Sequence, residues 1–123
     1  MSYLYHATDS VKLNNILESG LEVNRDGFVF FADNAEGAIN CIFFQHFKHI
    51  AIIVIETDDI DESLLRETCH NSADTFGCIV YKFEGSIKPD IFKRYAMVED
   101  IEVRRIELFY RQMIHLYNKI SNI

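Results

Sequence analysis

Short apolar runs alternate with amphipathic stretches along this chain, a pattern that predicts alternating strands and helices. Strands are expected over residues 2–7, 28–33, 49–58 and 78–83, which are rich in β-branched and aromatic side chains. The stretch 49–58, "HIAIIVIETD", is apolar almost throughout, as is typical of a strand with both faces buried. We therefore expect it at the centre of a sheet.

The spacing of apolar residues between these strands predicts helices. The first helix should begin at a cap formed by Asp9 or Ser10 and end at Gly20. Its apolar stripe is made of Leu13, Ile16 and Leu17. The second helix should begin at Asn34 and run for about three turns.

Three later segments complete the expected fold. A short helix is expected over 63–69 and a C-terminal helix over 97–122, while 89–95 fits either a strand or a helical turn. This mixture defines an α+β class, and 123 residues are enough for one domain, 1–123. No glycine-rich phosphate loop follows an expected strand, so the fingerprints of doubly wound nucleotide-binding folds are absent.

Charge narrows the range of partners. The chain has 19 acidic and 12 basic residues and a net charge of −7. A nucleic-acid binder usually presents a basic face, because neutralised phosphates supply much of its affinity, so a protein partner is favoured over nucleic acid. No apolar run approaches the ~20 residues of a membrane span, and no charged-then-apolar leader precedes the first strand. A cytoplasmic location without a membrane partner is expected, and the oligomeric state stays open.

The cysteines, Cys41, Cys69 and Cys78, show no CxxC spacing. Their odd number argues against a disulfide framework and a structural zinc site, and no metal is expected. Cys41 and Cys78 lie in apolar surroundings and are expected as small core residues. A nucleophile–base pair of Cys69 and His70 is disfavoured, because adjacent residues on a helix point apart.

Candidate chemistry begins where the first expected strand ends, at His6, Ala7 and Thr8. A histidine ring N–H can donate to a ribose hydroxyl, and the backbone of the next residue can bind an amide. The alternative is a structural histidine, which is the commoner role beside an apolar strand.

Two further places flank later strands. Phe30 and Phe31 should point to opposite faces of their strand, so that one is core and the other can floor a cleft under a planar ring. Both can also simply pack. Asp74 and Glu84 flank the strand 78–83, and either carboxylate can act as a hydrogen-bond acceptor or general base if it faces a cleft.

These segments, in this order, resemble the ADP-ribosyltransferase superfamily over about residues 3–92. "YHATDSVKLNNILESGL" follows the H-x-T…L-x-x-I-L-x-x-G-L pattern of the DarT-like and RNA 2′-phosphotransferase-like branches. "GFVFFADNAEGAINC" is similar to the G-I-Y-F-A-D…S-A-N-Y-C segment of poly(ADP-ribose) polymerases. "GCIVYKFEGSI" is similar to their E-Y-I-V-Y-D strand, which carries the catalytic glutamate.

The resemblance implies a split mixed sheet around an NAD cleft, with flanking helices. His6 would hold the nicotinamide-side ribose, Ala7 would offer its backbone to the nicotinamide amide, and Thr8 would brace the loop. Phe30 falls on the stacking tyrosine of the family's His-Tyr-Glu triad, and Arg25 on a phosphate-binding position. The residues implied to contact NAD are His6, Ala7, Thr8, Arg25, Phe30, Phe31, Asn40 and Gly77.

The family's catalytic glutamate falls on Gly77, or on Cys78 with a one-residue slip, so Asp74 or Glu84 would have to replace it. The resemblance thus implies an NAD-dependent mono-ADP-ribosyltransferase that modifies a macromolecule, with His6, Phe30 and one of these two acids as catalytic residues. Two alternatives remain: a catalytically silent binding or inhibitor module with the same cleft, and an RNA 2′-phosphotransferase-like enzyme.

Overall fold

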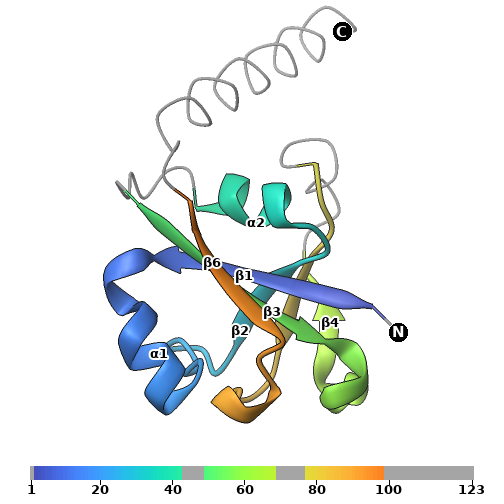
Figure 1. The fold of residues 1–123 in the computed structure, drawn as a ribbon. Helices are drawn as coiled ribbons and strands as arrows, with labels where there is room; N and C mark the ends of the chain where they lie inside the picture. Colours follow the sequence, from blue (N-terminus) through green and yellow to red (C-terminus); the bar gives the residue numbers. More distant parts are fainter. Residues whose placement is uncertain (1, 43–48, 69–76, 99–123) are drawn as a thin grey trace, which may run out of the picture.

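Six strands pair into one antiparallel sheet in the order β4-β5-β2-β1-β3-β6 (Figure 1). The structure, a computed structural model, describes residues 2–42, 49–68 and 77–98. The strands are β1 (Tyr3–Asp9), β2 (Val29–Ala32), β3 (Ile50–Glu56), β4 (Leu65–Glu67), β5 (Val80–Phe83) and β6 (Arg94–Val98). The α+β class is confirmed, but every strand pair within these ranges is antiparallel, so the expectation of a mixed sheet was wrong in that respect.

Helix α1 (Leu13–Ser19) is entered through a 3-10 turn, Ser10–Lys12. Asp9 caps this turn by accepting a hydrogen bond from the Val11 N–H at 3.2 Å. Gly20 ends the helix with a φ of 90°, a conformation that glycine adopts most easily. The expected cap and stop residues of the first helix are therefore both in place.

Helix α2 (Ala35–Cys41) begins at Asn34, as the sequence predicts. The Asn34 Oδ1 accepts a hydrogen bond from the Gly37 N–H at 2.6 Å, which satisfies one of the unpaired donors of the first turn. The remainder of the expected three turns, from residue 43 onward, lies outside the described residues.

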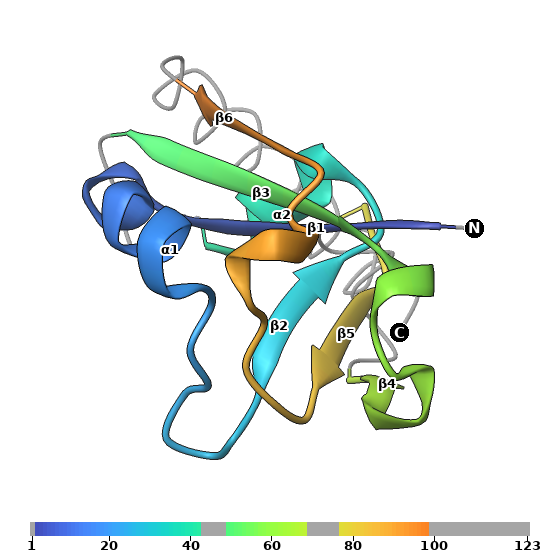
Figure 2. The same ribbon diagram turned by 60° about the horizontal axis from the view of Figure 1, so that its bottom comes forward.

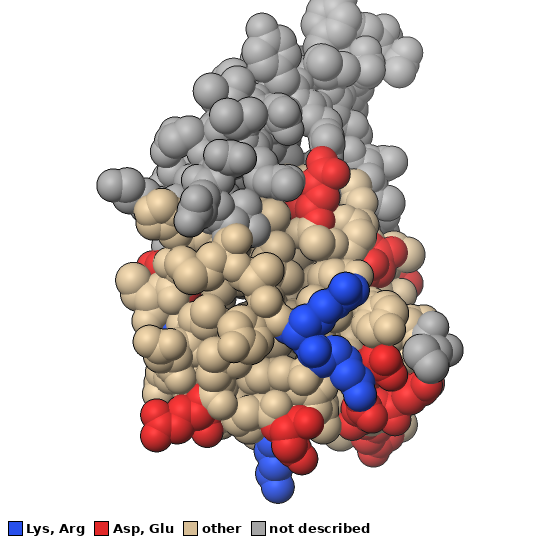
Figure 3. All heavy atoms as spheres, viewed as in Figure 1, with Lys and Arg blue, Asp and Glu red and all other residues tan. Residues whose placement is uncertain are grey.

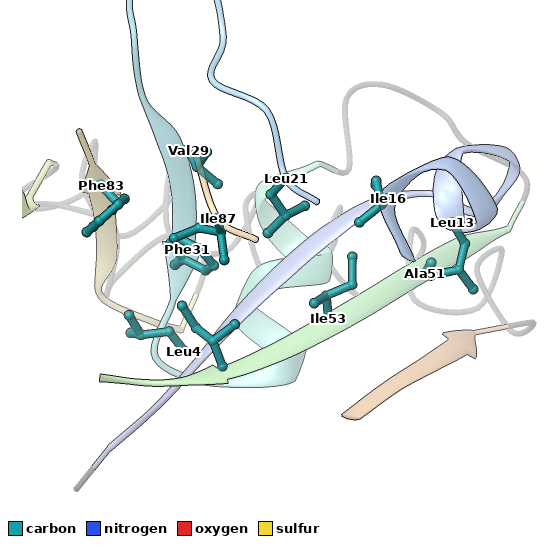
Figure 4. Packing of buried hydrophobic residues seen from close by; sticks show 11 residues of the cluster. Leu4, Leu13, Ile16, Leu21, Val29, Phe31, Ala51, Ile53, Phe83 and Ile87 are labelled. Carbon is teal, nitrogen blue, oxygen red and sulfur yellow. The ribbon is translucent and has the colours of Figure 1, made fainter. Parts of the chain in front are cut away.

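The two helices cover opposite faces of the sheet, so each face has its own apolar cluster. On the α1 face, the cluster contains Leu4, Leu13, Ile16, Leu21, Val29, Phe31, Ala51, Ile53, Ile55, Phe83 and Ile87 (Figure 4). On the α2 face, it contains Ala7, Ala32, Ala38, Ile39, Ile50, Ile52, Val54 and Cys78. Strand β3 contributes to both clusters, which confirms the expectation that both of its faces are buried. The expectation that it lies at the centre of the sheet was wrong, because β3 is next to the edge strand β6.

Three predictions about local structure need correction. β1 runs on to Asp9 because Asp9 still pairs with Ile50 of β3, so His6 lies inside this strand and not at its end. The helix expected over 63–69 is a 3-10 turn, Glu62–Leu64, followed by β4, because pairing with β5 gives this segment a backbone ladder. β6 includes Met97 and Val98, where the C-terminal helix was expected to begin, and residues 99–123 lie outside the described residues.

The region left undecided by its spacing contains both alternatives in succession. A 3-10 turn, Pro89–Ile91, precedes β6.

On the face shown in Figure 3, acidic side chains gather along the lower and right margins, whereas basic side chains form only small groups. No helix among the described residues is long and apolar enough to cross a membrane.

Candidate functional site

The sheet opens between β1 and β2. These strands share a single register pair, Tyr5 with Ala32, whereas β1 pairs with β3 along its whole length. Beyond that pair, β2 and β5 turn away together from β1 and β3 (Figure 2). We call this junction the β1–β2 seam.

The side chain of His6 bridges the open part of the seam. Its Nδ1 lies 2.7 Å from the backbone carbonyl oxygen of Phe30 on β2. If the ladder continued from Tyr5–Ala32, the next hydrogen-bonded pair would join Ala7 to Phe30, so the histidine ring occupies the acceptor that Ala7 would otherwise use.

The peptide of Ala7 consequently faces the opening. Ser10 N–H donates to the His49 carbonyl, and Thr57 N–H donates to the Ser2 carbonyl, so the even-numbered residues of β1 bond to β3. Alternation along an antiparallel strand then turns the N–H and C=O of Ala7 towards the β2 side, where the ladder has stopped. An amide group in the opening would meet a donor and an acceptor from one residue.

The hydrogen bond fixes the state of the His6 ring. A carbonyl oxygen only accepts, so Nδ1 carries the proton. Desolvation lowers the pKa of His6 from its ordinary value, the bond to Phe30 opposes this shift, and the positive charge of Lys12 adds a smaller lowering. The ring is therefore neutral near pH 7, and its Nε2 is a hydrogen-bond acceptor and not the donor expected from the sequence.

A cavity of about 360 Å³ lies at the seam. Its lining comes from both sides of the opening and from α2: Tyr5, His6, Ala7, Thr8, Lys12, Asn24, Phe30, Phe31, Ala32, Ala38, Cys41, Ile42 and Val80. The volume falls in the range of small-molecule sites, and the lining is mainly apolar with a few polar groups. No carboxylate belongs to this lining within the described ranges.

A second cavity, of about 370 Å³, lies on the α1 side of the first. His6, Thr8 and Lys12 line both cavities, so the two are neighbours. The rest of the second lining is Asn15, Ile16, Gly20, Leu21 and Glu22.

One of the two phenylalanines of β2 is buried and the other is exposed, as predicted. Phe31 is 2% exposed in the core, where the His6 ring meets it edge-on with ring centroids 5.8 Å apart. Phe30 is 43% exposed and lines the seam cavity. The first gives His6 a rigid backing, and the second is available for a ligand ring.

The remaining predicted contacts do not line the seam cavity. Arg25 is exposed in the loop before β2, and its neighbour Asn24 lines the cavity in its place. Asn40 is buried in α2 at 5% exposure. Gly77 has a φ of 72°, and its carbonyl accepts a hydrogen bond from Asn34 Nδ2 at 2.9 Å.

Of the two candidate acids, only Glu84 belongs to the described residues, and it does not line either cavity beside His6. Glu84 is exposed beyond the end of β5, whereas Val80, at the opposite end, is the β5 residue that lines the cavity. The Glu84 N–H donates to the Leu64 carbonyl at 3.0 Å, which ties it to the β4 side of the sheet. Asp74 lies outside the described residues.

Lys12 is the main site residue that sequence reasoning missed. It is exposed, it lines both cavities, and its charge acts on the His6 ring. Its position in the turn between His6 and α1 was the available signal. Tyr5 was also missed, because a tyrosine in a strand carries no mark that separates packing from ligand contact.

No protein-family model and no curated protein matches the chain.

Proposed function

We propose that the chain is an ADP-ribosyltransferase-like domain that binds NAD across the two cavities beside His6. One observation carries this proposal. The three segments of the resemblance lie on β1, β2 and β5, which are neighbours in the sheet, and the first two form the walls of the open seam.

The chemistry of the lining supports NAD in particular. The Ala7 peptide presents a donor and an acceptor to a carboxamide, and neutral His6 presents an acceptor to a ribose hydroxyl. Phe30 offers a ring face to nicotinamide. Lys12, between the cavities, offers a positive charge to the pyrophosphate.

The absence of a carboxylate from the described lining of the seam cavity favours the binding module as the second candidate. Transfer of ADP-ribose develops positive charge on the ribose as nicotinamide leaves, and removing a group that stabilises such charge typically costs ~10²–10³ in rate. Mono-ADP-ribosyl transfer to a protein acceptor therefore depends on Asp74 or Glu84 reaching the ribose. RNA 2′-phosphotransfer is supported least, since Lys12 is the only cation in the described lining of either cavity.

Calorimetry with NAD tests the binding step. We expect wild-type protein and His49→Ala to bind alike, because His49 is exposed and lines neither cavity, and His6→Ala to bind at least about tenfold more weakly. Equal affinity in all three proteins, or no binding by wild type, would refute the proposed site.

Incubation with labelled NAD and a cell lysate separates the two candidates. Label on a lysate protein that is lost in Asp74→Asn or Glu84→Gln supports the transferase and identifies its acid. Binding of NAD with no released nicotinamide and no labelled acceptor supports the silent module.

A further inference from the structure

We propose that Cys41 and Cys78 form an oxidisable dithiol in the wall of the seam cavity, which closes to a disulfide when it meets a low-molecular-weight disulfide such as glutathione disulfide. This inference is independent of NAD. It requires only the two thiols, the cavity and the oxidant.

The two sulfur atoms lie together although the cysteines are far apart in sequence. Cys41 is the last residue of α2, and Cys78 precedes β5. Their Sγ atoms are 3.9 Å apart and in hydrogen-bond contact. A disulfide bond of about 2.05 Å needs an approach of roughly 2 Å, which small side-chain rotations at two residues can supply.

The packing around Cys78 holds its thiol next to the thiol of Cys41. Gly37 of α2 faces Cys78 so closely that a Cβ at this position would overlap Cys78 Cβ and Sγ. Two hydrogen bonds hold the segment on either side of Cys78. Asn34 Nδ2 donates to the Gly77 carbonyl, and the Ile79 N–H donates to Asp33 Oδ1. Cys78 is thus fixed beneath α2, at 3% exposure, with little freedom to move away from Cys41.

The two thiols differ in access, which sets the order of reaction. Cys41 is half-buried and lines the seam cavity, so a reagent in the cavity reaches its sulfur first. Cys78 is buried and does not line this cavity. The hydrogen bond with Cys41 lowers the pKa of the Cys78 thiol, and burial and the charge of Asp33 oppose this.

Glutathione disulfide is the oxidant in this thiol–disulfide exchange. The Cys41 thiolate attacks one sulfur of glutathione disulfide, which forms a mixed disulfide and releases one glutathione thiolate. The Cys78 thiolate then attacks the Cys41 sulfur, forms the Cys41–Cys78 bond and releases the second glutathione. Each protein thiol gives its proton to solvent, the protein loses two electrons, and the oxidant gains them.

The test uses a Cys69→Ser background, so that Cys41 and Cys78 are the only thiols of the chain. The folded protein is incubated with glutathione disulfide and analysed by intact mass and peptide mapping. We expect the mass to fall by two hydrogens and both thiols to disappear together. In the same background, Cys78→Ser should instead keep one glutathione on Cys41, because no resolving thiol is present.

Other outcomes overturn the proposal. These are two separate glutathione adducts, one stable adduct on the protein with both cysteines, or no reaction under conditions that oxidise the urea-unfolded chain. Thiol titration in the absence of oxidant controls for spontaneous oxidation, and circular dichroism of each variant controls for loss of fold.

Discussion

Asn34 joins the start of α2 to the segment that enters β5, and its replacement should weaken both connections. Its Oδ1 accepts from the Gly37 N–H at 2.6 Å, and its Nδ2 donates to the Gly77 carbonyl at 2.9 Å. Losing an asparagine cap costs about 1 kcal/mol, and losing a neutral hydrogen bond costs about 1 kcal/mol. We therefore expect Asn34→Ala to lower the free energy of unfolding by about 2 kcal/mol.

Asn34→Asp separates the two contributions. The aspartate keeps an oxygen for the Gly37 N–H and places a negative charge at the helix start, but it has no donor for the Gly77 carbonyl. We expect this variant to lose about 1 kcal/mol, roughly half the effect of alanine. Asn14→Ala, at an exposed position of α1, is the matched control, with a change within about 0.7 kcal/mol that favours the variant.

Urea unfolding at 25 °C, followed by circular dichroism, measures these differences if the slope with denaturant is unchanged. A loss below about 0.5 kcal/mol for Asn34→Ala would refute the connecting role of the side chain. An aspartate variant as stable as the wild type would show that the bond to the Gly77 carbonyl contributes nothing.

Three further predictions concern backbone, protonation and charge. Gly20→Ala should lower the free energy of unfolding in urea by more than about 2 kcal/mol, because its Cβ would overlap the Ile87 carbonyl at a φ of 90°. Gly27→Ala, at a φ of 89° with nothing within 4 Å of its Cβ, should lower it by about 1 kcal/mol. Equal losses in the two variants would exclude the overlap as the cause. Because the folded pKa of His6 lies below the unfolded value of 6.5, the unfolded chain binds more protons just below pH 6.5. Lowering the pH through this range should therefore reduce the free energy of unfolding of the wild type relative to His6→Asn, by at most about 1.4 kcal/mol per pH unit. A difference between the two proteins that stays constant from pH 7.5 to 5 would contradict the direction of the pKa shift. Lys12→Gln should weaken NAD binding about threefold to tenfold in low salt and by less at high ionic strength, measured by calorimetry; a salt-independent loss would argue against a charge contact.

The sequence predicted those elements whose signals are local. The Asp9 and Asn34 caps, the Gly20 stop and the buried β3 each follow from the chemistry of a few adjacent residues. β4 was missed because its three residues are strand only through their pairing with β5. A propensity pattern carries no information about such a distant partner.

The candidate site shows the same division. Five of the predicted contact residues line one cavity, and each lies on a strand with a recognisable pattern: His6, Ala7, Thr8, Phe30 and Phe31. Lys12 and Tyr5 were missed, because their role depends on where β1 and β2 separate. The 3.9 Å approach of Cys41 to Cys78 depends likewise on how α2 packs, which no CxxC spacing could reveal.

The β1–β2 seam also has a mechanical consequence. It divides the sheet into two three-stranded halves, β4-β5-β2 and β1-β3-β6, that share one backbone pair. The chain crosses between these halves from β1 to β2, from β2 to β3, from β3 to β4 and from β5 to β6. Neither half is a continuous piece of sequence. The two halves are therefore joined mainly by side-chain packing, since the apolar cluster on each face contains residues from both halves.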